Sequence, residues 1–191
     1  MKKLDNQIFQ DRRKSFLSKL DGKAAIIPGA KLVQHHADCE YPFRQESNFW
    51  YLTGFDEPDA IALFLSHKPI GERYILFVHP KDIESEVWNG FRWGTNGAEK
   101  VFKADKSHPI SDFEKELPNY LMGADEIVFS VGKYPEIEPI VLNLWAKQID
   151  NYSRIGKAPR AIQPPGIYLN QMRLIKSQYE IERMREAALI S

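Results

Sequence analysis

The chain has 191 residues, the length of one domain with an additional segment, and its 26 basic and 26 acidic residues give a formal net charge of zero. A balanced charge provides no long-range field toward nucleic acid or an anionic membrane, so we expect neither as a partner. No apolar run approaches the ~20 residues of a membrane span, and the N-terminus lacks the apolar core of a signal peptide. The single cysteine, Cys39, cannot form an intramolecular disulfide, and together these features predict a cytoplasmic protein.

Apolar periodicity predicts alternating helices and strands over the first 150 residues. The spacing of Leu4, Ile8, Phe16 and Leu20 predicts an amphipathic helix that ends before Gly22. Short apolar runs predict buried strands at 24–29, 60–66, 73–80 and 125–132, the second and third joined as a hairpin. Two further helices are predicted at 110–123, with a bend or break at Pro118, and at 135–149, beginning near Pro135. This alternation predicts the α/β class.

A Pro- and Gly-rich stretch, GKAPRAIQPPG at 156–166, predicts a domain boundary. We therefore expect a first domain at 1–158, a linker at 159–166 and the start of a second domain at 167–191. In the last segment, Ser177-x-x-Glu180 is a capping box that predicts a helix with an apolar stripe. No glycine, asparagine or proline ends this helix, so we expect the second domain to continue beyond residue 191.

Local motifs for catalysis or metal binding are weak. The stretch HHADCE at 35–40 holds several metal-competent side chains, but adjacent histidines rarely face one centre and the spacing fits no common zinc motif. A polar loop is the preferred interpretation, with a metal site as the alternative. Ser47 and Ser66 lack the Gly-x-Ser-x-Gly context of a nucleophile, and no glycine-rich phosphate-binding motif occurs.

Two segments concentrate aromatic side chains, at 41–61 (YPFRQESNFWYLTGFDEPDAI) and at 84–97 (ESEVWNGFRWGTNG). We assign Phe49 and Leu52 to the core. Trp93 is about equally consistent with a ring that plugs the core edge and with one presented to a ligand. Because tryptophan, tyrosine, phenylalanine and arginine are enriched at interfaces, these segments predict an interdomain or intersubunit surface.

The segment YPFRQESNFWYLTGFDEP resembles the signature of the N-terminal domain of Xaa-Pro aminopeptidases (aminopeptidase P), which occurs in divergent form in prolidase and creatinase. EVWNGFRWG is similar to a Glu-x-Trp-x-Gly-x-Arg-x-Gly segment of that family, and MRLIKSQYEIERMREAALI is similar to the start of its catalytic domain. The three matches occur in the family's order, and the resemblance covers the whole chain.

This resemblance implies a mixed β-sheet flanked by helices, of the ribonuclease H-like creatinase/prolidase type, followed by the truncated first helix of a pita-bread catalytic domain. It also implies a metal-dependent enzyme that releases the N-terminal residue from peptides with proline in second position. Two divalent ions, usually manganese, are held in such enzymes by two aspartates, a histidine and two glutamates of the catalytic domain. This chain should then contain no catalytic or metal-binding residue and be inactive alone.

The resemblance further implies partners and residue roles. The partners are the chain's own C-terminal catalytic domain, other copies in a dimer or tetramer, and a peptide substrate with proline second. Trp88 and Arg154 match residues that reach the substrate groove of an adjacent subunit. Five signature residues are expected to serve the interface or the fold, namely Arg44, Gln45, Trp50, Tyr51 and Gly54, with Arg44 and Gln45 favoured as structural.

Three alternatives remain open from the sequence. The parent protein could be a non-catalytic, peptidase-like binding protein, because some relatives have lost their metal ligands. It could also be a prolidase or a creatinase on the same scaffold, although FWYLTGF fits the aminopeptidase better. A natural stand-alone oligomerisation module is the third, and the unfinished last helix argues against it.

Overall fold

The computed structural model describes residues 6–36, 39–82 and 90–190, and within them a six-stranded mixed sheet has the order β6-β5-β4-β1-β7-β8. Its strands are β1 (Ala24–Pro28), β4 (Ile61–Leu65), β5 (Tyr74–Val78), β6 (Lys106–Pro109), β7 (Ile127–Val128) and β8 (Ile162–Gln163). A two-stranded sheet is formed by β2 (Gln34–His36) and β3 (Cys39–Glu40). The prediction of a mixed α/β fold is confirmed.

Strand β1 lies at the centre of the sheet, antiparallel to β4 and parallel to β7. The predicted hairpin is confirmed, because β4 and β5 are consecutive and antiparallel. The outer pairs, β5 with β6 and β7 with β8, are parallel. All residues of β1, β4 and β5 are buried, which explains why their sequences read as continuous apolar runs rather than as alternating ones.

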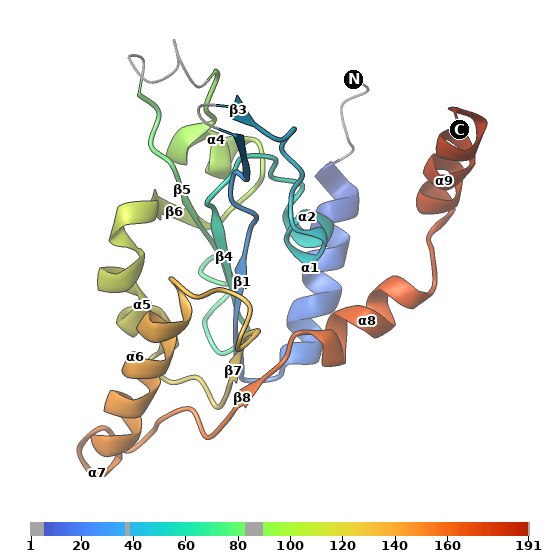
Figure 1. The fold of residues 1–191 in the computed structure, drawn as a ribbon. Helices are drawn as coiled ribbons and strands as arrows, with labels where there is room; N and C mark the ends of the chain where they lie inside the picture. The colour runs from blue at the N-terminus through green and yellow to red at the C-terminus, as the bar shows by residue number, and fades with distance from the viewer. Residues whose placement is uncertain (1–5, 37–38, 83–89, 191) are drawn as a thin grey trace.

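Helices cover both faces of the sheet (Figure 1). One face packs against α1 (Asn6–Leu20), α2 (Ser47–Thr53), α4 (Gly94–Lys100) and α8 (Gly166–Leu174), and the other against α5 (Phe113–Leu121) and α6 (Glu138–Asp150). Side chains alternate between the faces, as the strand period requires. Phe64 and Tyr74 therefore join the first core, while Leu63 and Ile75 join the second.

The structure revises two helix predictions. Pro118 does not break α5, which continues from Phe113 to Leu121 after a short 3₁₀ turn, η1 (Ile110–Asp112). Proline removes one backbone hydrogen bond from a helix, and burial of Leu117 and Leu121 offsets that loss. Helix α6 begins at Glu138 rather than near Pro135, with a proline in its first turn.

Packing continues past the predicted domain boundary. The segment 159–166, expected to be a linker, contains β8, whose pairing with β7 is extended by a bond from Ile127 N to Ala161 O of 2.9 Å. Next in the chain, α8 places Leu169, which is fully buried, in the same core as α1. The change in packing comes after α8, because α9 (Gln178–Ile190) contains no buried residue. By packing, the first unit therefore extends to about the end of α8.

Helix α9 begins with the predicted capping box. Glu180 Oε2 accepts from Ser177 N and Ser177 Oγ, both at 2.8 Å, and Ser177 Oγ accepts from Glu180 N at 3.3 Å. These bonds satisfy backbone donors that a helix start otherwise leaves free.

A short helix, α7 (Tyr152–Ile155), follows α6. None of the helices in the described segments is long and apolar enough to cross a membrane.

Candidate functional site

The aromatic signature folds into a short helix, α2, that is fixed at both ends. Glu46 caps its start, because Oε2 accepts from Asn48 N at 2.7 Å and from Phe49 N at 2.9 Å. Gly54 ends it in the left-handed conformation, with φ of 65°, and its N–H donates to Trp50 O at 2.9 Å. The helix therefore has a defined length and a defined face toward the core.

Gly54 is required for a second reason, which is the close approach of α1. A Cβ atom at this position would lie 2.5 Å from Cε2 and 2.7 Å from Cζ of Phe9. Phe9 itself is buried, and its ring meets that of Trp50 edge to face with centroids 5.9 Å apart. The glycine thus lets α1 and α2 pack closely enough to bring their aromatic side chains together.

Gln45 joins three separate stretches of backbone. Its Oε1 accepts from Ala30 N at 2.6 Å and from Glu46 N at 2.8 Å, and its Nε2 donates to Phe55 O at 3.2 Å and to Glu57 O at 2.8 Å. The side-chain amide therefore uses both its oxygen and its nitrogen within the fold. These contacts support the structural interpretation of Gln45, whereas Arg44 is exposed.

The two faces of α2 have different surroundings. Phe49 and Leu52 are fully buried, as predicted for core residues. Trp50 and Tyr51 are half-buried and face outward. The Tyr51 hydroxyl donates to Met172 O in α8 at 3.1 Å, and the Arg12 guanidinium lies 4.1 Å from the centroid of its ring. Burial raises the pKa of the Tyr51 hydroxyl, against the opposing effect of the Arg12 charge.

These outward side chains line a groove of 720 Å³ between α1, α2 and α9, which we call the signature groove. Its lining residues are Phe9, Arg12, Phe43, Arg44, Gln45, Ser47, Trp50, Tyr51, Asp56, Arg173, Lys176, Tyr179, Glu180, Arg183 and Met184. Four of the five signature residues expected to serve the interface or the fold, Arg44, Gln45, Trp50 and Tyr51, thus line this groove, while Gly54 lies against Phe9, which also lines it.

Charged contacts tie α8 and α9 to the signature. Arg12 Nη2 lies 3.1 Å from Glu180 Oε1, joining α1 to α9, and Arg173 Nη1 donates to Asn48 Oδ1 at 2.6 Å. Burial opposes ionisation of Glu180, but bonds from Ser177 and the Arg12 charge hold its pKa below the usual value. The amino-acid sequence does not single out Arg12 or Arg173, because a charge on a helix is usually solvated and no local pattern distinguishes these two.

A buried carboxyl group connects the signature to the second aromatic motif. Glu57 is 5% exposed; its Oε1 accepts from Trp93 N at 2.6 Å, and its Oε2 has no partner among the described residues. Burial raises the pKa of Glu57. The Trp93 ring packs edge to face on Phe102 at 5.4 Å, which supports its interpretation as a plug at the core edge.

Arg13 is a buried cation that no sequence pattern distinguishes either. It is 5% exposed, donates to Leu52 O at 3.0 Å and Phe102 O at 3.3 Å, and lies 4.4 Å from the centroid of the Tyr74 ring. The Leu52 carbonyl lies in the last turn of α2 and the Phe102 carbonyl two residues after the end of α4, near helix C-termini, whose dipoles favour a cation. Desolvation lowers the pKa of Arg13. Its contacts assign it a structural role in holding α1 to the two helices.

Of the two residues predicted to reach an adjacent subunit, only Arg154 belongs to the described part of the chain, and it lies away from this groove. Trp88 falls outside the described residues. Arg154 is exposed on α7, at the far end of α6 from α2 and α9 (Figure 1). The structure therefore does not bring Arg154 to the signature groove within one chain.

The histidine-rich stretch forms the β2–β3 hairpin, with His36 opposite Cys39. The His35 ring contacts those of His36 and Tyr41 at centroid distances of 4.7 and 4.5 Å. Asp38, which belongs to the same motif, lies outside the described residues. Over the described part of the chain, no three histidine, cysteine, aspartate or glutamate side chains are arranged to hold a metal ion.

Comparison with known proteins identifies the family. Residues 9–129 match the family model "Aminopeptidase P, N-terminal domain". Over 192 aligned positions the chain is 32% identical to the Xaa-Pro aminopeptidase of Escherichia coli (strain K12), covering all of this chain and 44% of that protein. It is 30% identical to the intermediate cleaving peptidase 55 of Saccharomyces cerevisiae, covering 37% of that protein. The chain therefore belongs to the aminopeptidase P family and corresponds to its N-terminal domain.

Solved structures agree with this assignment. The structure of Pseudomonas aeruginosa aminopeptidase PepP superposes with a TM-score of 0.91 at 31% identity, covering all of this chain and 43% of that one. Proline aminopeptidase P II from Yersinia pestis gives a TM-score of 0.89 at 33% identity. The chain spans less than half the length of these relatives.

Proposed function

We propose that this chain is the N-terminal domain of a metal-dependent Xaa-Pro aminopeptidase, which releases the N-terminal residue from peptides with proline in second position. In this proposal a C-terminal catalytic domain holds two divalent ions, usually manganese, and the present domain supports subunit assembly and shapes the substrate groove. The similarity of the whole chain to the E. coli Xaa-Pro aminopeptidase carries the proposal.

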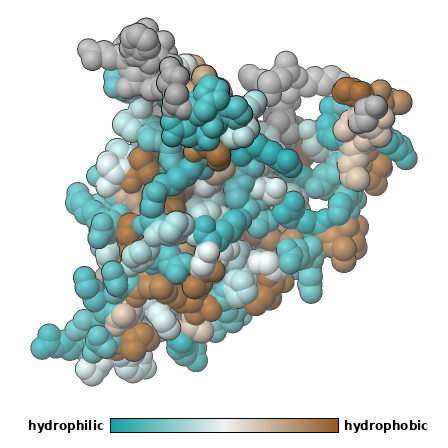
Figure 2. Space-filling model, viewed as in Figure 1, coloured by the Kyte–Doolittle hydropathy of each residue, from teal (hydrophilic) through white to brown (hydrophobic). Residues whose placement is uncertain are grey.

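The signature groove supports a packing role for this domain. It gathers aromatic rings and guanidinium groups, the side chains that interfaces favour. Helix α9, which borders it, leaves large apolar side chains exposed: Met184, Leu189 and Ile190. Figure 2 shows this hydrophobic surface at the end of α9. Because exposed apolar area of this kind favours association, we propose that the rest of the catalytic domain, which α9 would begin, packs on these side chains beside the signature groove.

Peptide hydrolysis tests the proposed activity. An Xaa-Pro peptide would be incubated with manganese and either this chain alone or the longer protein that the proposal requires. We expect cleavage only by the longer protein, because the proposal assigns the metal ligands to its C-terminal catalytic domain. Absence of cleavage by the longer protein would favour a non-catalytic binding protein. Cleavage by this chain alone would contradict the assignment of catalysis to a C-terminal domain.

The proposed contribution to a neighbouring subunit's groove can be tested separately. We expect Trp88→Ala and Arg154→Ala, made in the longer protein, to raise KM for peptides of four or more residues without loss of bound metal. An indole can pack on a proline ring, and a guanidinium can bind a peptide carboxylate or carbonyl. Lys147→Ala removes another exposed cation, on helix α6, and serves as the control. Unchanged KM in both variants would refute this role.

A further inference from the structure

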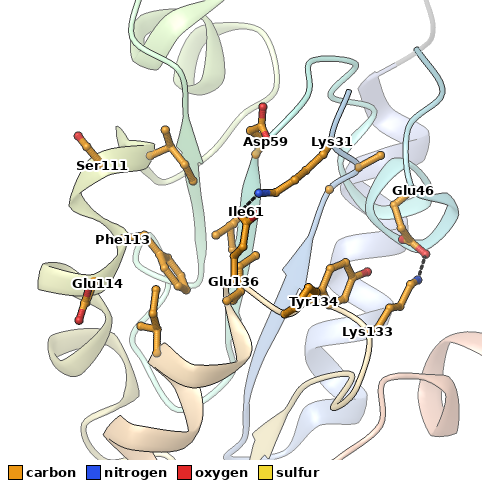
Figure 3. Close-up of a pocket in the computed structure, with 17 residues that line it drawn as sticks. Lys31, Glu46, Asp59, Ile61, Ser111, Phe113, Glu114, Lys133, Tyr134 and Glu136 are labelled. Atoms are coloured by element: carbon orange, nitrogen blue, oxygen red, sulfur yellow. Dashed lines mark hydrogen bonds and ion pairs between the residues drawn. The ribbon is translucent and has the colours of Figure 1, made fainter. Parts of the chain in front are cut away.

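A second cavity, of 610 Å³, lies on the opposite side of the sheet from α1 and outside the signature groove (Figure 3). It opens where β1 ends and β4 begins, between the starts of α5 and α6. Residues that follow the carboxyl ends of β1, β6 and β7 border it, and open α/β sheets bind ligands at this edge. Its volume falls within the range of small-molecule sites.

The floor of this cavity is apolar. It is lined by Ile61, Ile110, Phe113, Tyr134, Pro135, Ile137 and Ile140. Ile61 and Phe113 are each 4% exposed, so they form a fixed surface that belongs to the second core. Such a lining accepts a branched or aromatic hydrocarbon group and excludes an extended polar one.

Two lysine–carboxylate ion pairs border the cavity, and they differ in their other contacts. Lys133 pairs with Glu46 at 2.9 Å, but Glu46 also caps α2, so this pair already has a structural role. Lys31 pairs with Glu136, and both side chains are exposed, at 51% and 71%. In Figure 3 the Lys31 and Glu136 side chains meet beside Ile61. An exposed ion pair contributes little stability, so Lys31 and Glu136 can exchange partners readily.

We propose that this cavity binds a free α-amino acid with an apolar side chain. The carboxylate of the ligand pairs with the Lys31 ammonium, the α-ammonium pairs with the Glu136 carboxylate, and the side chain packs on Ile61, Phe113 and Ile137. The charge pattern selects this class, because the two opposite charges of an α-amino acid are separated by a single carbon and match two groups that already touch. A ligand with one charge would leave either Lys31 or Glu136 without its counterpart. This proposal does not depend on the proposed peptidase activity.

Methyl NMR spectroscopy of this chain can both detect binding and locate it. Four of the lining residues are isoleucines, at positions 61, 110, 137 and 140, so their labelled δ1-methyl groups report directly on the cavity. We expect L-leucine to shift these signals saturably and to leave the exposed Ile70, which does not line the cavity, unchanged. Shifts confined to other isoleucines, or none up to the solubility of leucine, would overturn the proposal.

Ligand analogues test the need for both charges. 4-Methylpentanoate lacks the ammonium group of leucine, 3-methylbutylamine lacks its carboxylate, and leucylproline separates the two charges by a peptide unit. We expect each to bind at least about tenfold more weakly than leucine, because each loses a charge-assisted contact. Equal affinity of leucine and either single-charge analogue would overturn the pairing scheme, and equal affinity of leucylproline would overturn the assignment to a free amino acid.

Variants of the ion pair complete the test. Lys31→Gln and Glu136→Gln change exposed side chains, so the fold should be retained, and each should weaken leucine binding about tenfold. Lys106→Gln is the matched control, because Lys106 and Glu72 form a similarly exposed pair, at 3.1 Å, away from the cavity. Unchanged leucine affinity in both cavity variants, or an equal loss in the control, would refute the role of Lys31 and Glu136.

Discussion

Substitution of Gly54 by alanine is the sharpest test of how the signature helix is held. Two effects add at this position. A non-glycine residue in the left-handed conformation costs about 1–2 kcal/mol. The new Cβ would also lie 2.5 Å from the Phe9 ring, an overlap that only movement can relieve, and overpacking of this kind costs about 1–3 kcal/mol. We expect Gly54→Ala to lower the free energy of unfolding by about 3 kcal/mol.

Urea denaturation followed by circular dichroism measures this change. With a denaturant slope of about 2 kcal/mol/M, a loss of about 3 kcal/mol moves the midpoint down by about 1.5 M. Gly132→Ala is the matched control, because Gly132 also has positive φ, 81°, but a Cβ there would have no neighbour within 4 Å. Gly132→Ala should therefore lower the free energy of unfolding by the backbone contribution alone, about 1–2 kcal/mol.

A double-mutant cycle separates the contact from the backbone effect. If the overlap with Phe9 matters, Gly54→Ala combined with Phe9→Leu should be less destabilised than the sum of the two single variants. Equal midpoint shifts for Gly54→Ala and Gly132→Ala, together with strict additivity in the cycle, would refute the claim that close α1–α2 packing requires Gly54.

Three further predictions concern the packing of α8, the buried carboxyl group and the Gln45 network. Leu169→Ala should lower the free energy of unfolding by about 3 kcal/mol and the exposed Ile167→Ala by less than about 0.5 kcal/mol; equal small losses would exclude α8 from the core. Because the pKa of Glu57 is raised in the folded state, wild type loses stability as the pH rises from the usual glutamate pKa of 4.5 toward the raised one, so Glu57→Gln should gain stability relative to wild type over this range in chemical denaturation. A difference constant with pH would contradict this. Gln45→Ala leaves four backbone groups without their partner and should lower stability by about 2–4 kcal/mol in thermal unfolding, whereas a loss below about 0.5 kcal/mol would show that water replaces the amide.

Several features of this protein could be predicted from short stretches of sequence. Continuous apolar runs identified β1, β4 and β5, because strands buried on both faces need no polar alternation. The capping box of α9 could be recognised in the sequence because its two partners, Ser177 and Glu180, are three residues apart. The aromatic signature indicated the family because its residues are contiguous in the chain, and the match to the aminopeptidase P family model agrees.

The class of fold, the central strands and the family were therefore predictable from the amino-acid sequence, since these depend on local periodicity and on motifs. Three features became visible only in the folded chain: the Pro-rich segment supplies β8, α8 belongs to the first core, and Arg12 pairs with Glu180 near the opposite end of the chain. The apolar cavity beside Lys31 and Glu136 is likewise built from segments about 100 residues apart. Such contacts depend on which surfaces the folded backbone brings together, and the spacing of residues within a short stretch of sequence does not predict them.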